Sequence, residues 1–190
     1  MEIRAAHPSE QSTIEAVVAA AFEEEPDGLV VQMVRALNLA GATRISLVAT
    51  HDERIVGHVQ LSKAWIDARS RLVDALMLTP LSVLPERQGQ GAGTRLVEEA
   101  LRTADEMGVA AVFLEGDPGY YGTRGFVSAA SLELLRPSLR IPEPAFQVAT
   151  LSCYESSMTG HVIYPESMWD TDSVGLRDPR LATIENALSS

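Results

Sequence analysis

The chain has 190 residues, a length that predicts one domain, and its 46% hydrophobic and 22% charged residues exclude a wholly disordered protein. The formal net charge is −11 at pH 7, so the chain has few basic residues from which to form the basic patch of a nucleic-acid-binding protein. The one cysteine, Cys153, excludes an intramolecular disulfide framework and a cysteine-rich zinc site.

No segment predicts a secretory signal or a membrane-spanning helix. Residues 1–8 lack an apolar core of secretory length. The longest apolar stretch, Val17 to Phe22, is far shorter than the roughly 18 residues of a membrane helix. We therefore expect a reduced cytoplasmic protein that binds no membrane. The histidines His7, His51 and His161 are scattered along the chain and predict no metal site.

The first third of the chain predicts a strand, two helices and a hairpin, in that order. Residues 2–6 are a short strand candidate, and apolar residues recur at helical spacing within 8–22 and again within 29–40. Residues 44–50 and 55–62 alternate as hairpin strands around a polar turn.

The middle of the chain predicts a strand, a helix and a second strand. Residues 71–83 form a strand that Thr79–Pro80 interrupts, because proline cannot donate to a strand ladder and marks a bulge or an end of pairing. The clearest helix has one apolar face from Leu96 to Met107. Residues 109–114 are apolar throughout, as in a strand covered on both faces.

The last third predicts a short helix or turn around Tyr120–Tyr121 and strands at 126–135 and 145–151. Residues 166–190 lack strong periodicity and are expected to form a loop-rich extension. Strands that alternate with helices, together with an early antiparallel hairpin, predict an α/β or α+β layered domain with a mixed sheet.

A glycine-rich loop carries the clearest chemical signal. The strand that ends near Val83 runs into a loop with Gly89, Gly91 and Gly93, and a helix follows at once. Glycines let the backbone curve so that successive N–H groups point at one spot. The helix adds its own unpaired N–H groups and a partial positive charge. This pattern predicts a phosphate-binding loop, which works at net negative charge because its donors are backbone groups.

The spacing in this loop selects among phosphate ligands. Gly93 is followed by Thr94–Arg95, so the Gly-Lys-Ser/Thr of a Walker loop is missing, and the dinucleotide pattern G-x-G-x-x-G also fails. The pattern Q-x-x-G-x-G fits at Gln88, Gly91 and Gly93. It resembles the acetyl-coenzyme A loop of the GNAT superfamily of N-acetyltransferases, where this loop holds the pyrophosphate.

Further motifs extend the resemblance over residues 1–165. Residues 81–85 look like the central strand of the family, which pairs with the pantetheine arm. Residues 116–126, Gly-Asp-Pro-Gly-Tyr-Tyr-Gly-Thr-Arg-Gly-Phe, resemble the tyrosine signature of a bacterial subgroup, as does Gly160–Pro165. Thr123–Arg124 departs from the subgroup, which has an arginine followed by an aromatic residue.

The resemblance implies a GNAT-like acetyltransferase domain over 1–165, with a largely antiparallel central sheet flanked by helices. It implies an enzyme that moves an acetyl group from acetyl-coenzyme A to a primary amine by direct attack in a ternary complex. Tyr121 matches the tyrosine that gives a proton to the coenzyme A sulfur. The cofactor-binding residues implied are Leu81, Ser82, Val83, Arg87, Gln88, Gly89, Gln90, Gly91, Ala92, Gly93, Thr94 and Tyr121. A backbone N–H near Leu81–Val83 is the implied oxyanion donor.

The sequence leaves the general base open. Glu115 is our first choice, because it ends an apolar strand beside the expected cleft, where burial raises the pKa of a carboxyl. Asp117 follows closely but also suits a turn cap before Pro118. His58 shares a strand face with Gln60 and Ser62. It is expected either to line a pocket or to be a buried or exposed histidine with no catalytic role. A chain of waters is a fourth possibility.

The acceptor and the assembly are less defined. Glu23–Glu25, between the first two helices, would attract a cationic small-molecule amine or form a solvated helix end. The proline-rich end after Pro137 allows a homodimer. The alternatives are a non-catalytic coenzyme A-binding or sensor module on the same fold, a loop for another nucleotide, and transfer of a larger acyl group.

Overall fold

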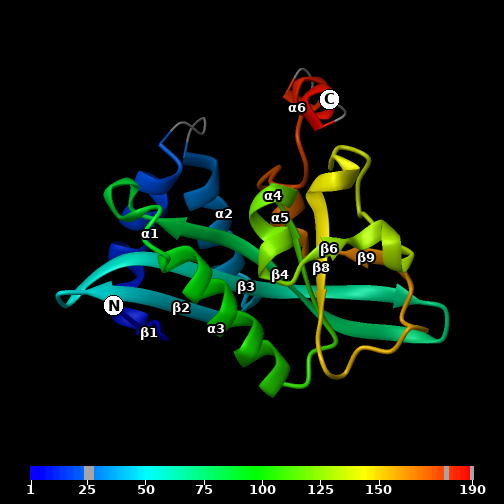
Figure 1. The fold of residues 1–190 in the computed structure, drawn as a ribbon, viewed down its shortest axis with the longest axis horizontal. Coiled ribbons are helices and arrows are strands. Elements are labelled where there is room, and N and C mark those ends of the chain that lie inside the picture. The colour runs from blue at the N-terminus through cyan, green and yellow to red at the C-terminus, as the bar shows by residue number, and fades with distance from the viewer. Residues whose placement is uncertain (24–27, 178–179, 189–190) are drawn as a thin grey trace.

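The computed structural model describes residues 1–23, 28–177 and 180–188, drawn in Figure 1. In chain order its strands and helices are β1 (Glu2–Ala5), α1 (Gln11–Ala21), α2 (Leu29–Leu39), β2 (Thr43–His51), β3 (Arg54–Ala68), β4 (Arg71–Val83), α3 (Ala92–Glu106), β5 (Ala111–Glu115), α4 (Pro118–Tyr121), β6 (Val127–Ser128), β7 (Leu134–Leu135), β8 (Phe146–Thr150), β9 (Gly160–Ile163), α5 (Glu166–Asp170) and α6 (Arg180–Leu188). In these ranges, no helix combines the length and apolar character needed to cross a bilayer.

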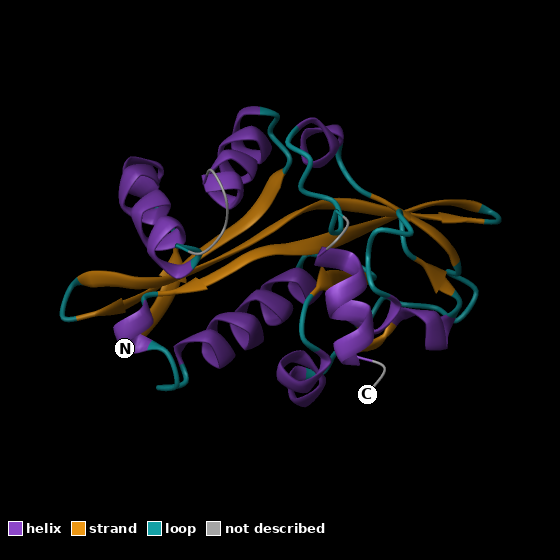
Figure 2. Ribbon diagram, turned by 90° about the horizontal axis from the view of Figure 1, so that it is seen from above, coloured by secondary structure: helices purple, strands orange, loops and turns teal. Residues whose placement is uncertain are grey.

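The described residues form one sheet of nine strands, and the predicted fold class is confirmed. The main path runs β1-β2-β3-β4-β5-β8-β6, and β9 pairs with β3 and β7. The β4–β5 and β7–β9 pairs are parallel, while every other recorded pair is antiparallel. The sheet is therefore mixed and largely antiparallel. Helices cover both of its faces, with α1 and α2 on one side and α3 on the other (Figure 2).

The helices are held by the apolar stripes that the sequence predicts. On α3, Leu96, Val97, Ala100 and Ala104 are buried against the sheet, in one cluster with residues of β2 to β5. On the opposite face, α1 buries Ile14, Val17 and Val18 in a cluster that includes residues of β2 and β3. A third core gathers around the stacked rings of Phe113 and Phe146. Burial at helical spacing thus fixes each helix on its face of the sheet.

The sheet has an opening between β4 and β5. These strands pair at only two positions, Leu76 with Val112 and Met77 with Phe113. On its other edge β4 pairs with β3, where a register shift between Val59 and Leu61 places an extra residue on β4. This irregularity lies at Thr79–Pro80, where the sequence predicts an interruption. Past Met77, no described strand pairs with the β5 side of β4, so its polar backbone groups remain available to a ligand.

Two predictions about the last third are wrong. Residues 126–135 are not a strand but the short β6, a 3-10 turn over Ala129–Leu132, and β7. The chain turns sharply at Glu133, whose φ is +57°, so a continuous strand is interrupted there. Residues 166–190 are not loop-rich, because α5 and α6 occupy most of the described part. The first part of this segment also packs into the domain, since Met168 and Val174 are fully buried.

Candidate active site

The glycine loop forms a concave anion-binding element at the start of α3. Gly89 and Gly91 have φ of +71° and +86°, a region that glycine adopts without the steric cost of a side chain. Gly91 is the N-cap of α3, so the unpaired N–H groups of its first turn lie next to the loop. Gln88 ties the loop to the sheet, because its side-chain amide donates to the carbonyl of Val83 at 3.0 Å.

This loop lines a groove of about 650 Å³, which we call the loop groove. Its walls contain every predicted cofactor residue except Ser82 and Gln90. The side chain of Ser82 is fully buried, and that of Gln90 donates to the carbonyl of Glu86 at 3.1 Å. The remaining lining residues, which the sequence analysis did not assign to the cofactor, are Asp117, Tyr120 and Arg124.

Arg124 joins the tyrosine segment to the glycine loop. Its guanidinium lies 3.6 Å from the ring centre of Tyr120 and donates to Thr94 Oγ1 at 2.8 Å. A cation over an aromatic face is an attractive contact, so these bonds fix α4 beside the start of α3. The departure at Thr123–Arg124 thus leaves an arginine in the groove wall. The positive charge of Arg124 within the tyrosine motif is the sequence signal that could have indicated its place in this groove.

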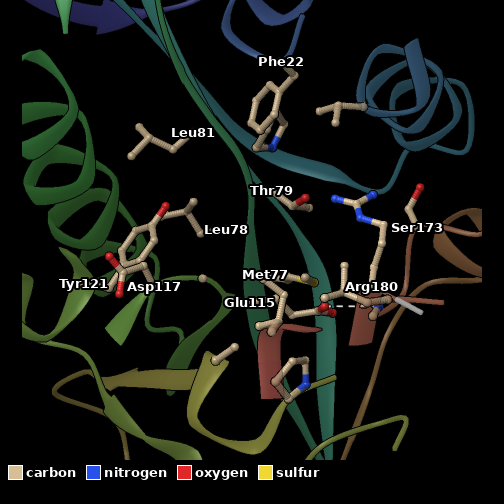
Figure 3. Close-up of a pocket in the computed structure, with 18 of the residues that line it drawn as sticks. Phe22, Met77, Leu78, Thr79, Leu81, Glu115, Asp117, Tyr121, Ser173 and Arg180 are labelled. Atoms are coloured by element: carbon tan, nitrogen blue, oxygen red, sulfur yellow. Dashed lines mark hydrogen bonds between the residues drawn. The ribbon is translucent and has the colours of Figure 1, made fainter. Parts of the chain in front are cut away.

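A second space, of about 600 Å³, lies on the other side of Tyr121, and we call it the inner cavity. Tyr121, Asp117 and Leu81 line both spaces, so the loop groove and the inner cavity meet at these side chains. The end of α1, α2, the bulged part of β4 and the C-terminal segment form the other walls (Figure 3). A molecule in the groove and a molecule in the cavity would therefore meet beside Tyr121.

Tyr121 is held in place by aromatic contacts. Its ring packs edge-on against Tyr120 and Phe126, with ring centres 4.9 and 5.7 Å away. Burial raises the pKa of Tyr121 above its ordinary value of 10.0, and the neighbouring Tyr120 adds to the increase. The phenol therefore keeps its proton at neutral pH, as a proton donor must.

Glu115 lines the inner cavity at the end of β5. Its Oε2 accepts a hydrogen bond of 3.1 Å from the backbone N–H of Gly175, 60 positions later in the chain. Burial raises the pKa of Glu115 to about 7, although the Gly175 bond, Tyr164 and the charge of Arg140 act to lower it. The carboxyl is therefore divided between its charged and neutral forms near neutral pH.

The other two candidate bases lie in different surroundings. Asp117 is the N-cap of α4, and its Oδ1 accepts a bond of 2.8 Å from the N–H of Gly119, as the turn-cap interpretation predicts. His58 is fully buried, lies 3.0 Å from Ser46 Oγ through its Nε2, and lines neither space. Burial lowers the pKa of His58 to about 4, so it is neutral at physiological pH.

The remaining predictions concern the acidic run and metals. Of Glu23–Glu25, Glu23 is exposed after the end of α1, while Glu24 and Glu25 lie outside the described residues. In the part of the chain that the structure describes, no cluster of three or more histidine, cysteine or acidic side chains is placed to hold a metal ion.

Comparison with known proteins identifies the family. Residues 2–129 match the model of the acetyltransferase (GNAT) domain. The N-acetyltransferase YhbS of Escherichia coli K12, itself uncharacterized, is 34% identical over 170 residues, which cover 87% of this chain and 97% of YhbS. YjhQ of the same strain, another uncharacterized N-acetyltransferase, is 30% identical over 121 residues, or 62% of this chain and 67% of YjhQ.

Two solved structures share the fold closely and hold coenzyme A compounds. The crystal structure of E. coli YhbS in complex with coenzyme A has a TM-score of 0.78 and 31% identity, over 88% of this chain and 91% of that one. A GNAT family acetyltransferase from Brucella melitensis, in complex with acetyl-coenzyme A, has a TM-score of 0.71 and 29% identity, over 88% and 97%. This chain belongs to the GNAT family of N-acetyltransferases.

Proposed function

We propose that this protein transfers the acetyl group of acetyl-coenzyme A to a primary amine of a small molecule, in a ternary complex. The observation that carries the proposal is the meeting of the loop groove and the inner cavity at Tyr121. The groove offers an anion-binding loop for one substrate, and the cavity offers room and a carboxyl for the other. Tyr121, to which we assign the role of proton donor, lines both spaces.

The residues of the loop groove fit a coenzyme A thioester. The N–H groups of the loop and of the first turn of α3 suit the pyrophosphate, and Arg87 and Arg124 supply positive charge in the same groove. The free edge of β4 over Leu81–Val83 offers backbone donors and acceptors to the amide groups of the pantetheine arm. The Brucella relative, whose crystal structure contains acetyl-coenzyme A, also supports this choice of ligand.

The transfer needs several proton and charge movements, and the site has a group for three of them. The amine nitrogen attacks the thioester carbonyl carbon, and a backbone N–H near Leu81–Val83 stabilises the oxyanion that forms. The carbon–sulfur bond then breaks, and Tyr121 gives its proton to the departing sulfur. Glu115 is the base that takes one proton from the ammonium form before the attack, and the nitrogen loses a second proton to water as the amide forms. The products are an amide and the free thiol of coenzyme A.

Glu115 suits the role of base at neutral pH. An alkylamine has a pKa near 10.4, so most of it is protonated and its proton must be removed. A carboxyl with a pKa of about 7 holds a proton far better than an ordinary one, and above neutral pH it is ionised and ready to accept. The bond from Gly175 fixes the carboxyl in one orientation.

Calorimetric titration with acetyl-coenzyme A, coenzyme A and ATP tests the proposal. We expect binding of both coenzyme forms and none of ATP, followed by thiol release when amines are added. Failure of both coenzyme forms to bind would refute it. Binding of the coenzyme without thiol release from any amine would favour the non-catalytic coenzyme A-binding or sensor module.

A further inference from the structure

The walls of the inner cavity are mainly apolar. From the side of α1 and α2 come Phe22, Leu29, Val30 and Met33, and from β4 come Met77, Leu78 and Pro80. The C-terminal segment adds Leu176, Ile184, Ala187 and Leu188. Removal of an apolar ligand surface from water would supply most of the binding free energy in such a space.

The helix α6 presents an apolar face to this cavity without being packed into the core. Ile184, Ala187 and Leu188 lie at helical spacing after Arg180, and all four line the cavity. No described residue of α6 is buried, and Ile184 and Leu188 are 40% and 38% exposed. In Figure 1, α6 stands beyond α4 and α5, away from the sheet. An apolar body in the cavity would cover this face.

The charges of the wall suit one amine rather than several. Glu115 and Asp117 belong to the segment that carries Tyr121, so two carboxyl groups of the wall lie near the proposed proton donor. The wall also contains the positively charged Arg180. The third acidic residue of the wall, Asp172, pairs with Arg140 and Arg177. A polyamine or an aminoglycoside would have to place further ammonium groups, stripped of water, against apolar side chains, which is costly.

The cavity is also too large for an acetyl group and a small acceptor alone. Its volume of about 600 Å³ lies within the range of sites for drug-sized ligands. We propose that the acceptor is a primary amine carried on an apolar body, such as an arylalkylamine or a long-chain alkylamine. The amine faces Glu115 and Tyr121, and the body lies between α2 and α6. This inference rests on the proposed function.

Thiol release at saturating acetyl-coenzyme A, measured with two groups of amines, tests the inference. Phenethylamine, tryptamine and octylamine have apolar bodies, while spermidine, lysine and kanamycin carry several polar or charged groups. We expect kcat/KM for the best apolar amine to exceed that for every polar amine by at least about tenfold, since burying even part of such a body contributes that much.

A matched pair of variants locates the apolar body. In Ile184→Asn, the KM for the apolar amine should rise about threefold to tenfold, because a cavity contact is lost. The kcat and the KM for acetyl-coenzyme A should stay unchanged. Leu39→Asn is the control, because Leu39 is 89% exposed at the end of α2 and does not line the cavity. It should leave every constant at the wild-type value.

The outcomes separate the inference from the function on which it rests. If acetyl-coenzyme A does not bind, the proposed function itself fails. If it binds and spermidine, lysine or kanamycin is the better acceptor, the function stands and the inference is overturned. The inference also fails if no apolar amine is acetylated or binds the coenzyme A complex. It fails as well if octanoyl-coenzyme A is preferred to acetyl-coenzyme A, because the cavity would then hold an acyl chain.

Discussion

The placement of Tyr121 depends on the absence of a side chain at Gly116. A Cβ atom at Gly116 would lie 2.5 Å from Cε2 and 2.9 Å from Cδ2 of the Tyr121 ring. The backbone of Gly116 is held on both sides and cannot readily move away. Its N–H donates to the carbonyl of Ala145 and its carbonyl accepts from the side chain of Gln147, both at 3.0 Å. We therefore expect Gly116→Ala to displace the tyrosine.

The size of the displacement follows from ordinary packing distances. Few real Cβ atoms have neighbours nearer than 3.4 Å, so the ring edge must move by about 1 Å. The ring also packs against Tyr120 and Phe126, which restrict the directions in which it can move. A misplacement of about 1 Å in a catalytic group costs about a hundredfold in rate. We expect kcat to fall by this factor, with a smaller change in the KM for acetyl-coenzyme A.

The measurement is steady-state thiol release, with the melting temperature recorded on the same samples. Gly122→Ala is the matched control, because a Cβ there meets no atom within 4 Å and the residue has helical φ and ψ of −58° and −32°. If Gly116→Ala and Gly122→Ala turn over equally fast, the reasoning is refuted, and the position of the Tyr121 ring does not limit the reaction.

Four further predictions concern the groups of the proposed mechanism. Tyr121→Phe keeps the ring contacts but removes the proton donor, so kcat should fall about 10²–10⁴-fold while calorimetry finds nearly unchanged affinity for acetyl-coenzyme A. Gly91→Glu should abolish acetyl-coenzyme A binding in the same titration. The substitution places a negatively charged side chain in the anion-binding loop, at a φ of +86° that favours glycine. Circular dichroism checks that the variant is folded. In the wild type, kcat/KM should rise with pH to a plateau above about pH 7, where Glu115 is ionised, and Glu115→Gln should lose both this rise and most of the activity. The same raised pKa means that the folded state binds a proton that the unfolded state releases, so this contribution to stability is full below about pH 4.5 and lost as the pH rises through 7. Urea unfolding at pH 5 and pH 8 should therefore show that the wild type loses about 2.5 kcal/mol relative to Glu115→Gln, and equal losses in the two proteins would contradict the burial of this carboxyl.

Features fixed by local chemistry could be predicted from the sequence. The apolar face of α3 recurs over four turns, so its burial followed from spacing alone. The irregularity in β4 followed from Pro80, which has no N–H to donate. The glycines at 89 and 91 indicated a loop with positive φ before a helix, and the structure has both. In each case, a property of one residue or one period determined the local structure.

Features that depend on distant packing could not be predicted. The segments β6, β7 and β9 have two to four residues each, too few for a period to be visible, and their pairing is set by partners far along the chain. The helix α5 has only five residues, and Met168 is buried because of a core formed by other segments. Arg124 was noticed as a departure from a motif, but its contact with Thr94 crosses 30 positions.

Glu115 shows how these two kinds of information combine at the site. Its place at the end of an apolar strand predicted burial and a raised pKa, and the structure has both. The orientation of its carboxyl, however, comes from Gly175, and the buried hydroxyl of Tyr164 faces it as a further neighbour. The segment that carries Gly175 also supplies Ser173 and Leu176 to the wall of the inner cavity. The same C-terminal segment therefore shapes the space for the acceptor and sets the environment of the proposed base, so a substrate that displaced this wall would also change the basicity of Glu115.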